Sequence, residues 1–338
     1  MSLFAPIRNE FYNNFESAID RTVEIDKTKN DIVLNGKHDV ITPFITSIQK
    51  LDLSIKGAYY SPTEPSLKQL FARLKTHLST DYLSEISIDQ LRLDNLNFVL
   101  LKMFGKTLTF RTEGDILRAV VGKRYATYSN FALLSTLKNH TNFPTERYAY
   151  IHISDYKMRV DMLSPDKLSA NTGDISEFGL NAVNSESGRS CVGINYIIYH
   201  NHNGIKYNVI IPTNQMVSGR IRHVGEINKI NNYVANLANL VYKNIDNIKE
   251  KWKNLPDKKL SVTEISRAFF YLTKIVGQKL TQTIADERTG ILIYKDKKPT
   301  IQEISAYSFI NSIMSSIYDE IKDQEIKGRL EEYAGSYI

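Results

Sequence analysis

The chain of 338 residues is 42% hydrophobic and 24% charged, and it carries a formal net charge of +6 at pH 7. This composition supports a folded core and excludes a disordered chain, which would combine low hydrophobicity with high charge. A single cysteine, Cys191, excludes an intramolecular disulfide and a cysteine-rich zinc site. The net positive charge favours an anionic partner.

The chain begins without a basic segment followed by an apolar run. Its apolar runs are also shorter than the roughly 18 residues that a membrane-spanning helix needs. We therefore expect no signal peptide, no membrane contact and a cytoplasmic location.

Residues 1–105 are predicted to form a mostly helical region. Apolar residues spaced three or four apart predict one helix over 66–78, capped by Ser66, and a second over 88–104. A short strand is expected over 31–34, and the rest of the first 60 residues has no clear pattern.

From residue 106 the apolar spacing changes from helical to alternating, which predicts strands. Two antiparallel strands are expected over 107–112 and 116–128, joined by a Glu-Gly-Asp turn. A short helix should follow over 131–139, with Asn130 as its N-cap.

A second alternating stretch covers residues 148–162 and predicts strand structure with a bend near Asp155. The polar residues 163–174 that follow predict a loop. The carboxylates of Asp155 and Asp161 have no partner that the sequence can place, so we expect both at the surface.

The clearest hairpin joins strands over 192–199 and 205–211 through Asn203-Gly204, a pair that tolerates the positive φ of a type I′ turn. The pattern also puts an aliphatic and aromatic ladder on one face. The register pairs His202 with Ile205, His200 with Tyr207, Ile198 with Val209 and Tyr196 with Ile211.

His200 and His202 lie two residues apart on one face of this hairpin, a spacing with which two imidazoles can bind one metal ion. The alternative is a pair of polar residues at the mouth of the hairpin. The sequence favours that alternative, because no third ligand stands at a fixed spacing from them. We therefore predict no metal site and no cofactor.

Residues 226–338 are predicted to be helical, beginning with a long amphipathic helix from Ile227 to Trp252. Capping-box patterns at 261–264 and 300–303 should begin a helix through residue 284 and the last helix. The apolar stripes of these helices are typical of a core or of an oligomer contact, and we expect a homo-oligomer.

Together these patterns predict an α+β fold. An antiparallel β-sheet core over residues 106–225 is flanked by N-terminal helices within 1–105 and by a C-terminal helical region over 226–338.

Cations gather in residues 102–124, where six lysines and arginines accompany two carboxylates. This segment is the best candidate for a phosphate-binding surface. Tyr125 and Tyr128 follow it and either stack on bases or pack in the sheet, and packing is expected for one of them.

Two further segments offer candidate contacts. The NSESG turn that begins at Asn184 is either an ordered turn or a loop that presents Glu186 and Arg189 to a partner. The basic segment RIRH, ending at His223, suits phosphate, and a solvated strand edge is the alternative. The predicted nucleic-acid contacts are Arg118, Lys123, Arg124, Tyr125, Arg189, Arg220, Arg222 and His223.

GLNAVNSESG, the NG hairpin and RIRHVG, together with the upstream VVGKRYATYSN, resemble the phage/plasmid-like protein family known as domain of unknown function 932. The resemblance covers residues 120–241. It implies phage, prophage or plasmid origin, hence the host cytoplasm, and no established chemistry. Asn201 stands where family members often have cysteine, which argues against a thiolate there. The matching positions are Gly122, Arg124, Tyr125, Asn130, Asn184, Ser185, Glu186, Gly188, Asn203, Gly204, Arg222 and His223.

No phosphate-binding glycine loop, dinucleotide fingerprint, zinc-protease motif or nucleophile elbow occurs in the sequence. We therefore predict a nucleic-acid-binding protein, with single-stranded DNA as the partner in annealing, recombination or replication. One alternative is a structural or host-interaction protein that assembles through its helices. The other is a metal-dependent nuclease that uses Glu186 with Asp155 or Asp161.

Overall fold

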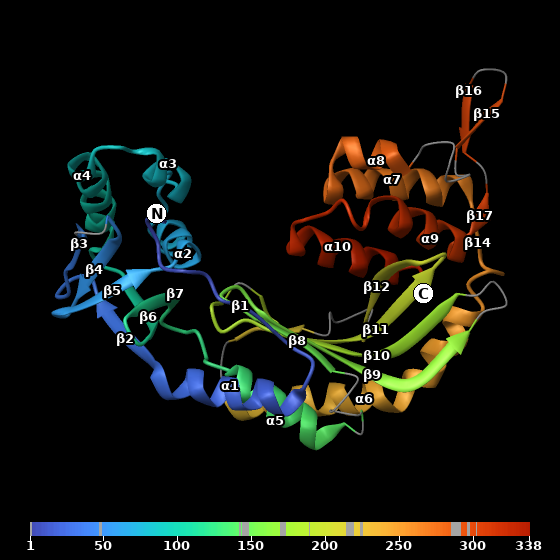
Figure 1. Cartoon of the computed structure of the whole chain (residues 1–338), viewed down its shortest axis with the longest axis horizontal. Coiled ribbons are helices and arrows are strands. Elements are labelled where there is room, and N and C mark those ends of the chain that lie inside the picture. The colour runs from blue at the N-terminus through green and yellow to red at the C-terminus, as the bar shows by residue number, and fades with distance from the viewer. Residues whose placement is uncertain are drawn as a thin grey trace.

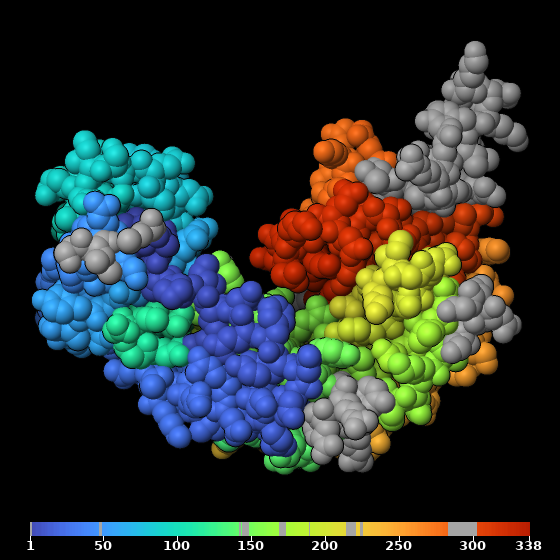
Figure 2. Space-filling view, viewed as in Figure 1, coloured from blue at the N-terminus to red at the C-terminus, as the bar shows by residue number. Residues whose placement is uncertain are grey.

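The computed structural model describes residues 2–46, 49–141, 143, 149–169, 174–188, 190–213, 220–223, 226–284, 292–295, 298–301 and 303–338. The fold is α+β, as the sequence predicts, but it has two large sheets where one was expected. Each sheet belongs to its own lobe, and the lobes are joined at the base of a U-shaped molecule (Figure 1). Figure 2 shows the hollow between the lobes.

The first lobe is built on a six-stranded sheet in the order β2-β6-β7-β5-β4-β3. The strands are β2 (Lys29–Asn35), β3 (Ile41–Ile45), β4 (Leu51–Ile55), β5 (Ala58–Pro62), β6 (Thr107–Glu113) and β7 (Ile116–Gly122). Because β6 and β7 join the strands that precede them, this sheet spans the boundary predicted at residue 105. The N-terminal region therefore holds four of the six strands as well as helices.

The helices of the first lobe are α2 (Glu64–Leu74), α3 (Thr80–Glu85) and α4 (Asp89–Leu100), followed by the 3-10 turn η1 (Leu101–Met103). Thr63, and not the predicted Ser66, caps α2, because its side chain accepts a hydrogen bond from the Ser66 amide. The apolar faces of these helices and of the sheet form one buried core.

The second lobe is built on a seven-stranded antiparallel sheet in the order β1-β8-β9-β10-β11-β12, with β13 paired to β11. Its strands are β1 (Asn9–Tyr12), β8 (Ala149–Ser154), β9 (Met158–Ser169), β10 (Ile175–Asn184), β11 (Val192–His202), β12 (Ile205–Pro212) and β13 (Arg220–Ile221). The loop predicted over 163–174 is wrong as far as Ser169, since β9 stays paired with β10 to that residue. The rest of that stretch up to residue 173 lies outside the described residues.

The predicted hairpin register between β11 and β12 is confirmed at every pair, from His202 opposite Ile205 to Tyr196 opposite Ile211. Asn203 and Gly204 both adopt positive φ, 51° and 85°, as a type I′ turn requires. Turn chemistry and alternation therefore suffice to fix this register.

Helices cover the second sheet on both faces and along its length (Figure 1). They are α1 (Phe15–Thr28), α5 (Asn130–His140), α6 (Ile227–Lys253), α7 (Val262–Val276), α8 (Gln278–Ile284), α9 (Ala306–Ile317) and α10 (Gln324–Gly335). Short strand pairs join β14 (Lys259–Leu260) to β17 (Ile304–Ser305) and β15 (Leu292–Lys295) to β16 (Lys298–Ile301).

The long helix α6 follows the predicted stripe, and the capping box of Ser261 with Glu264 at α7 makes both of its hydrogen bonds. Three other helix predictions are corrected. Ser129 caps α5 in place of Asn130. The helix expected through residue 284 breaks at Gly277, whose φ is 87°. The last helices begin after Ser305, because residue 300 belongs to β16.

The apolar stripes of α6 and α9 are buried within the chain against the second sheet. The predicted self-association was based on these stripes, and because they are buried within one chain they do not support it. Within the described residues, no helix combines the length and apolarity needed to cross a bilayer.

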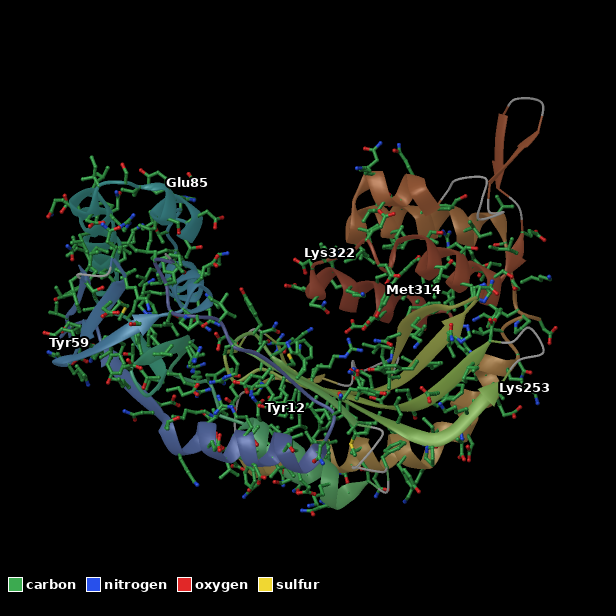
Figure 3. All side chains as sticks on the ribbon, in the orientation of Figure 1. Tyr12, Tyr59, Glu85, Lys253, Met314 and Lys322 are labelled. Atoms are coloured by element: carbon green, nitrogen blue, oxygen red, sulfur yellow. The ribbon has the colours of Figure 1, made fainter. Side chains whose placement is uncertain are left out.

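The chain passes between the lobes three times. Residues 3–5 lie in the first lobe, and β1 then pairs with β8 of the second. Helix α1 packs in the second core and leads directly into β2. The segment after β7 returns to α5 of the second core. In Figure 3 Glu85 and Lys322 mark opposite sides of the hollow, and Tyr12 lies in the base.

We expect Gly335→Ala to separate α10 from β12. A Cβ at Gly335 would lie 2.0 Å from the backbone oxygen of Ile210, too close for any relaxation within the helix. The free energy of unfolding in urea should fall by about 1–3 kcal/mol. Gly328→Ala in the same helix is the control: the nearest atom to its Cβ would be Lys157 Nζ at 4.0 Å. Equal stability of the two variants would contradict the close approach.

Candidate nucleic-acid interface

The segments with the recognised motifs meet where the two sheets adjoin. Asn184, at the end of β10, is fully buried. Its side-chain amide donates hydrogen bonds to Asn130 Oδ1 and to the Tyr128 carbonyl oxygen, both at 2.9 Å. The segment after β7 and the NSESG turn are thus bound to each other, although some 55 residues separate them in the sequence.

The NSESG turn is held from both lobes. The Ser185 and Ser187 hydroxyls donate to the Tyr156 carbonyl oxygen at 2.6 and 3.0 Å. The Glu186 carboxylate accepts from the Asn130 amide at 2.6 Å and pairs with Lys29 Nζ at 2.9 Å. These contacts support the ordered-turn alternative, since Glu186 is used within the chain. Arg189 lies outside the described residues.

Tyr125 is packed against this turn. Its hydroxyl donates to the Ser185 carbonyl oxygen, and its ring stacks on His223 with 4.8 Å between centroids. The Arg111 guanidinium lies 5.8 Å from the ring centroid, and a Cβ on Gly188 would come within 3.1 Å of the ring. Burial raises the pKa of the Tyr125 hydroxyl. These contacts occupy much of the half-buried ring, so base stacking by Tyr125 stays a prediction that its packing disfavours.

Two more predicted contacts are also internal. His223 is buried, and its carbonyl oxygen accepts from the Ala126 amide at 2.9 Å. Tyr128 is fully buried, and its hydroxyl donates to Asn231 Oδ1 at 3.0 Å. Packing of one of the two tyrosines was expected, and the structure packs both.

A network of ion pairs fills the junction between the lobes. Arg118 pairs with Glu113 and with the buried Asp155, each at 3.2 Å. Arg8 bonds to Glu113, and its backbone amide donates to Asp155 Oδ2 at 3.0 Å. Burial, followed by the nearby Arg118, lowers the pKa of Arg8. Because two carboxylates already pair with Arg118, its predicted contact with phosphate is disfavoured.

The junction encloses a cavity of about 30 Å³, which has room for one or two water molecules. Asp155 and Glu186 both line it, each paired with a cation. Asp161 lies elsewhere, bound to Arg159 at 2.9 Å and to Asn181 at 2.6 Å. The expectation of surface positions for Asp155 and Asp161 is wrong, since both are buried ion-pair partners. Of the carboxylates named for the nuclease alternative, Glu186 and Asp155 line this cavity, each paired with a cation, whereas Asp161 lies apart from them.

Three of the remaining predicted cations, Lys123, Arg124 and Arg222, are exposed. Lys123 and Arg124 lie in the turn closed by the hydrogen bond from the Tyr125 amide to the Gly122 carbonyl. Arg222 is also exposed. The next residue, His223, stacks on Tyr125, which follows Arg124 in the sequence, and this brings the backbone of Arg222 close to the same turn. Arg220 begins the short strand β13, and its side chain lies outside the described part of the chain.

Two further cations extend this surface from other elements. Arg73 Nη1 lies 3.3 Å from where a Cβ on Gly122 would stand. Lys106 Nζ donates to the Arg73 carbonyl oxygen at 2.7 Å. We call the resulting set the cationic edge. It consists of Arg73, Lys106, Lys123, Arg124 and Arg222.

None of the ion pairs found between described residues involves a side chain of the cationic edge. Lys106 is half-buried, and the other four side chains are exposed. Sequence reasoning missed Arg73, which comes from the end of α2 and carries no local signal. It also missed Phe104, which is 76% exposed two residues before Lys106.

A polar ladder on the second sheet was missed as well. Asp161, Asn181 and Asn195 stand directly opposite one another on β9, β10 and β11, and all three are buried. Asn195 donates to Asn181 at 3.3 Å, and Asn181 donates to Asp161. The sequence signal was present, because each of these polar residues stands between two apolar neighbours in its strand.

The hairpin histidines have a third potential ligand. Asp174, His200 and His202 offer one ligand atom each within 4.8 Å of one another, a set that could hold a metal ion. The sequence could not reveal this set because Asp174 lies 26 residues before His200 and meets it only through strand pairing.

Acid should weaken the fold through His223. Burial lowers the pKa of His223 to about 4, against about 6.5 when unfolded. The stabilisation of the fold that comes from keeping the His223 ring neutral is fully present above pH 6.5. It is lost as pH falls towards 4, because the unfolded chain then binds a proton that the folded chain does not.

We expect the free energy of unfolding to fall between pH 6.5 and 4, and His223→Gln to reduce that fall by roughly 1–3 kcal/mol. The control is His77→Gln, whose exposed ring should leave the pH dependence as in the original chain. Denaturant unfolding at several pH values measures both. Identical pH profiles for His223→Gln and the original chain would contradict the assignment.

Comparison with models of protein families, with curated proteins and with solved structures finds no match for this chain. The resemblance to the phage/plasmid-like family therefore stays a prediction based on its motif residues. Most of those residues surround the NSESG turn. Asn203 and Gly204 lie apart from them, at the hairpin turn that ends β11.

Proposed function

We propose that the chain binds single-stranded nucleic acid along the cationic edge. The observation that supports this most is the contrast between two sets of cations in one region. Arg8 and Arg118 are paired with carboxylates inside the junction, whereas four of the five side chains of the cationic edge are exposed and none of the five takes part in an ion pair between described residues. Phosphate oxygens are the partners that such a row of guanidinium and ammonium groups binds.

A single strand suits the edge better than a duplex because an exposed aromatic ring adjoins it. Unpaired bases stack on aromatic side chains, whereas the faces of paired bases are covered. Phe104 is the ring in question: it is 76% exposed and stands two residues before Lys106 in the sequence. Single-stranded DNA, met during annealing, recombination or replication, is the partner consistent with the family resemblance.

The alternatives have less support. A nuclease needs carboxylates that can hold a metal ion, and those of the junction are paired with Lys29 and Arg118. A structural or host-interaction role through the C-terminal helices, with a homo-oligomer as its product, was inferred from the apolar stripes of α6 and α9, and those stripes are buried in the core of the chain.

We expect labelled single-stranded DNA to bind with an affinity that falls with salt, as measured by fluorescence anisotropy. Replacing Arg124 and Arg222 together by alanine should lower the salt slope by up to about 1.4, or roughly 0.7 for each lost phosphate contact. Phe104→Ala should weaken binding by about 1–3 kcal/mol per stacked base at unchanged slope.

The matched control removes the same charge elsewhere. Lys138 and Lys229 are surface lysines paired with Glu16 and Glu226, at 2.6 and 3.4 Å, so their double alanine variant should keep the original slope. If both double variants lose affinity equally, net charge and not the cationic edge is responsible. Absence of binding at low salt would refute the proposal.

A further inference from the structure

Strand pairing brings two short polar patterns together at the far end of the second sheet. His200 and His202 are alternate residues of β11, and Ser176 lies opposite His200 on β10. Asp174, two residues before Ser176, comes to lie beside His202 on the same face. The Asp174 carboxylate and His202 Nδ1 are 2.9 Å apart.

A fourth donor comes from helix α9. The Tyr307 hydroxyl donates to the Asp174 carboxylate and lies 3.3 Å from His200 Nε2. Ligands bound tetrahedrally at about 2.0–2.2 Å from a zinc ion stand roughly 3.3–3.5 Å apart. Three of the donor pairs stand 2.5, 2.9 and 3.3 Å apart, and the ligand atoms of Asp174, His200 and His202 all lie within 4.8 Å of one another, so an ion entering between them would push the closest pairs apart.

Outer contacts orient the ligands from behind. His200 Nδ1 lies 2.8 Å from the Ser176 hydroxyl, which in turn accepts from Trp252 Nε1 at 2.9 Å. These contacts leave Nε2 as the nitrogen of His200 that faces Asp174 and Tyr307. Metal-binding histidines usually engage their second ring nitrogen in this way, which fixes the orientation of the ring.

Burial also fits an ion-binding site with one entrance. Asp174 and His200 are each 2% exposed, and Trp252 and Tyr207 pack against the His200 ring. His202 retains 25% of its side-chain exposure and gives the route from solvent.

We propose that Asp174, His200 and His202, with the Tyr307 hydroxyl, form a binding site for a divalent transition metal ion of the zinc type. Two imidazoles and one carboxylate suit zinc and its neighbours, whereas calcium and magnesium prefer oxygen ligands alone. Four protein donors close the shell, which is typical of a structural site. The ion would join β10 and β11 to α9, and so fix the C-terminal helices on the sheet.

The test is a calorimetric titration of chelator-treated full-length protein with zinc. We expect one zinc per chain and a rise in Tm on binding. His202→Ala, at the most exposed ligand, should weaken binding at least tenfold and abolish the rise. His152→Ala is the control, since His152 lies on β8 of the same sheet and bonds to Asn9 at 2.7 Å. It should bind zinc as the original chain does.

Three results would overturn the proposal: no stoichiometric zinc, equal affinity of the original chain and His202→Ala, or a six-coordinate spectrum when cobalt replaces zinc. Should His202→Ala fail to fold, Asp174→Asn takes its place, because it keeps the shape of the ligand and loses its charge. Binding of DNA does not enter any of these readouts.

Discussion

Paired charges buried between two sheets are the constraint on which the rest of this molecule depends. Lys29 and Glu186 on one side of the junction, and Arg118 and Asp155 on the other, connect residues of the first lobe to turns of the second. Burying an ion is tolerable only beside its partner, and removing one member leaves the other uncompensated. The junction therefore fixes how the lobes meet and holds the NSESG turn.

The buried network fixes the positions of the exposed cations. The turn that presents Lys123 and Arg124 is followed by Tyr125, whose hydroxyl is bound to the NSESG turn. Arg222 is held in the same way through the His223 ring on Tyr125. Buried residues thus fix the positions of the exposed cations. The NSESG turn therefore supports the contact surface and is not itself that surface.

Features that depend on neighbouring residues could be predicted from the sequence. The β11–β12 register, the stripe of α6 and the capping box at Ser261 each follow from spacing or turn chemistry. Features that depend on distant residues could not. Arg118 and Arg124 are six residues apart and look alike in the sequence, yet Asp155 neutralises only the first. The partition of strands into two sheets, and the meeting of Asp174 with the histidines, are hidden for the same reason.

The three passages of the chain between the lobes have a consequence for how the protein folds and moves. All strands and helices of the first lobe lie within residues 29–122, which are inserted between α1 and α5, so the second lobe is not a continuous stretch of sequence. Strand β1 must pair with β8 across about 140 residues, and such contacts of high sequence separation slow the search for the native topology. Three parallel connections also resist bending more than a single linker would. The width of the hollow is therefore set by covalent topology as much as by packing.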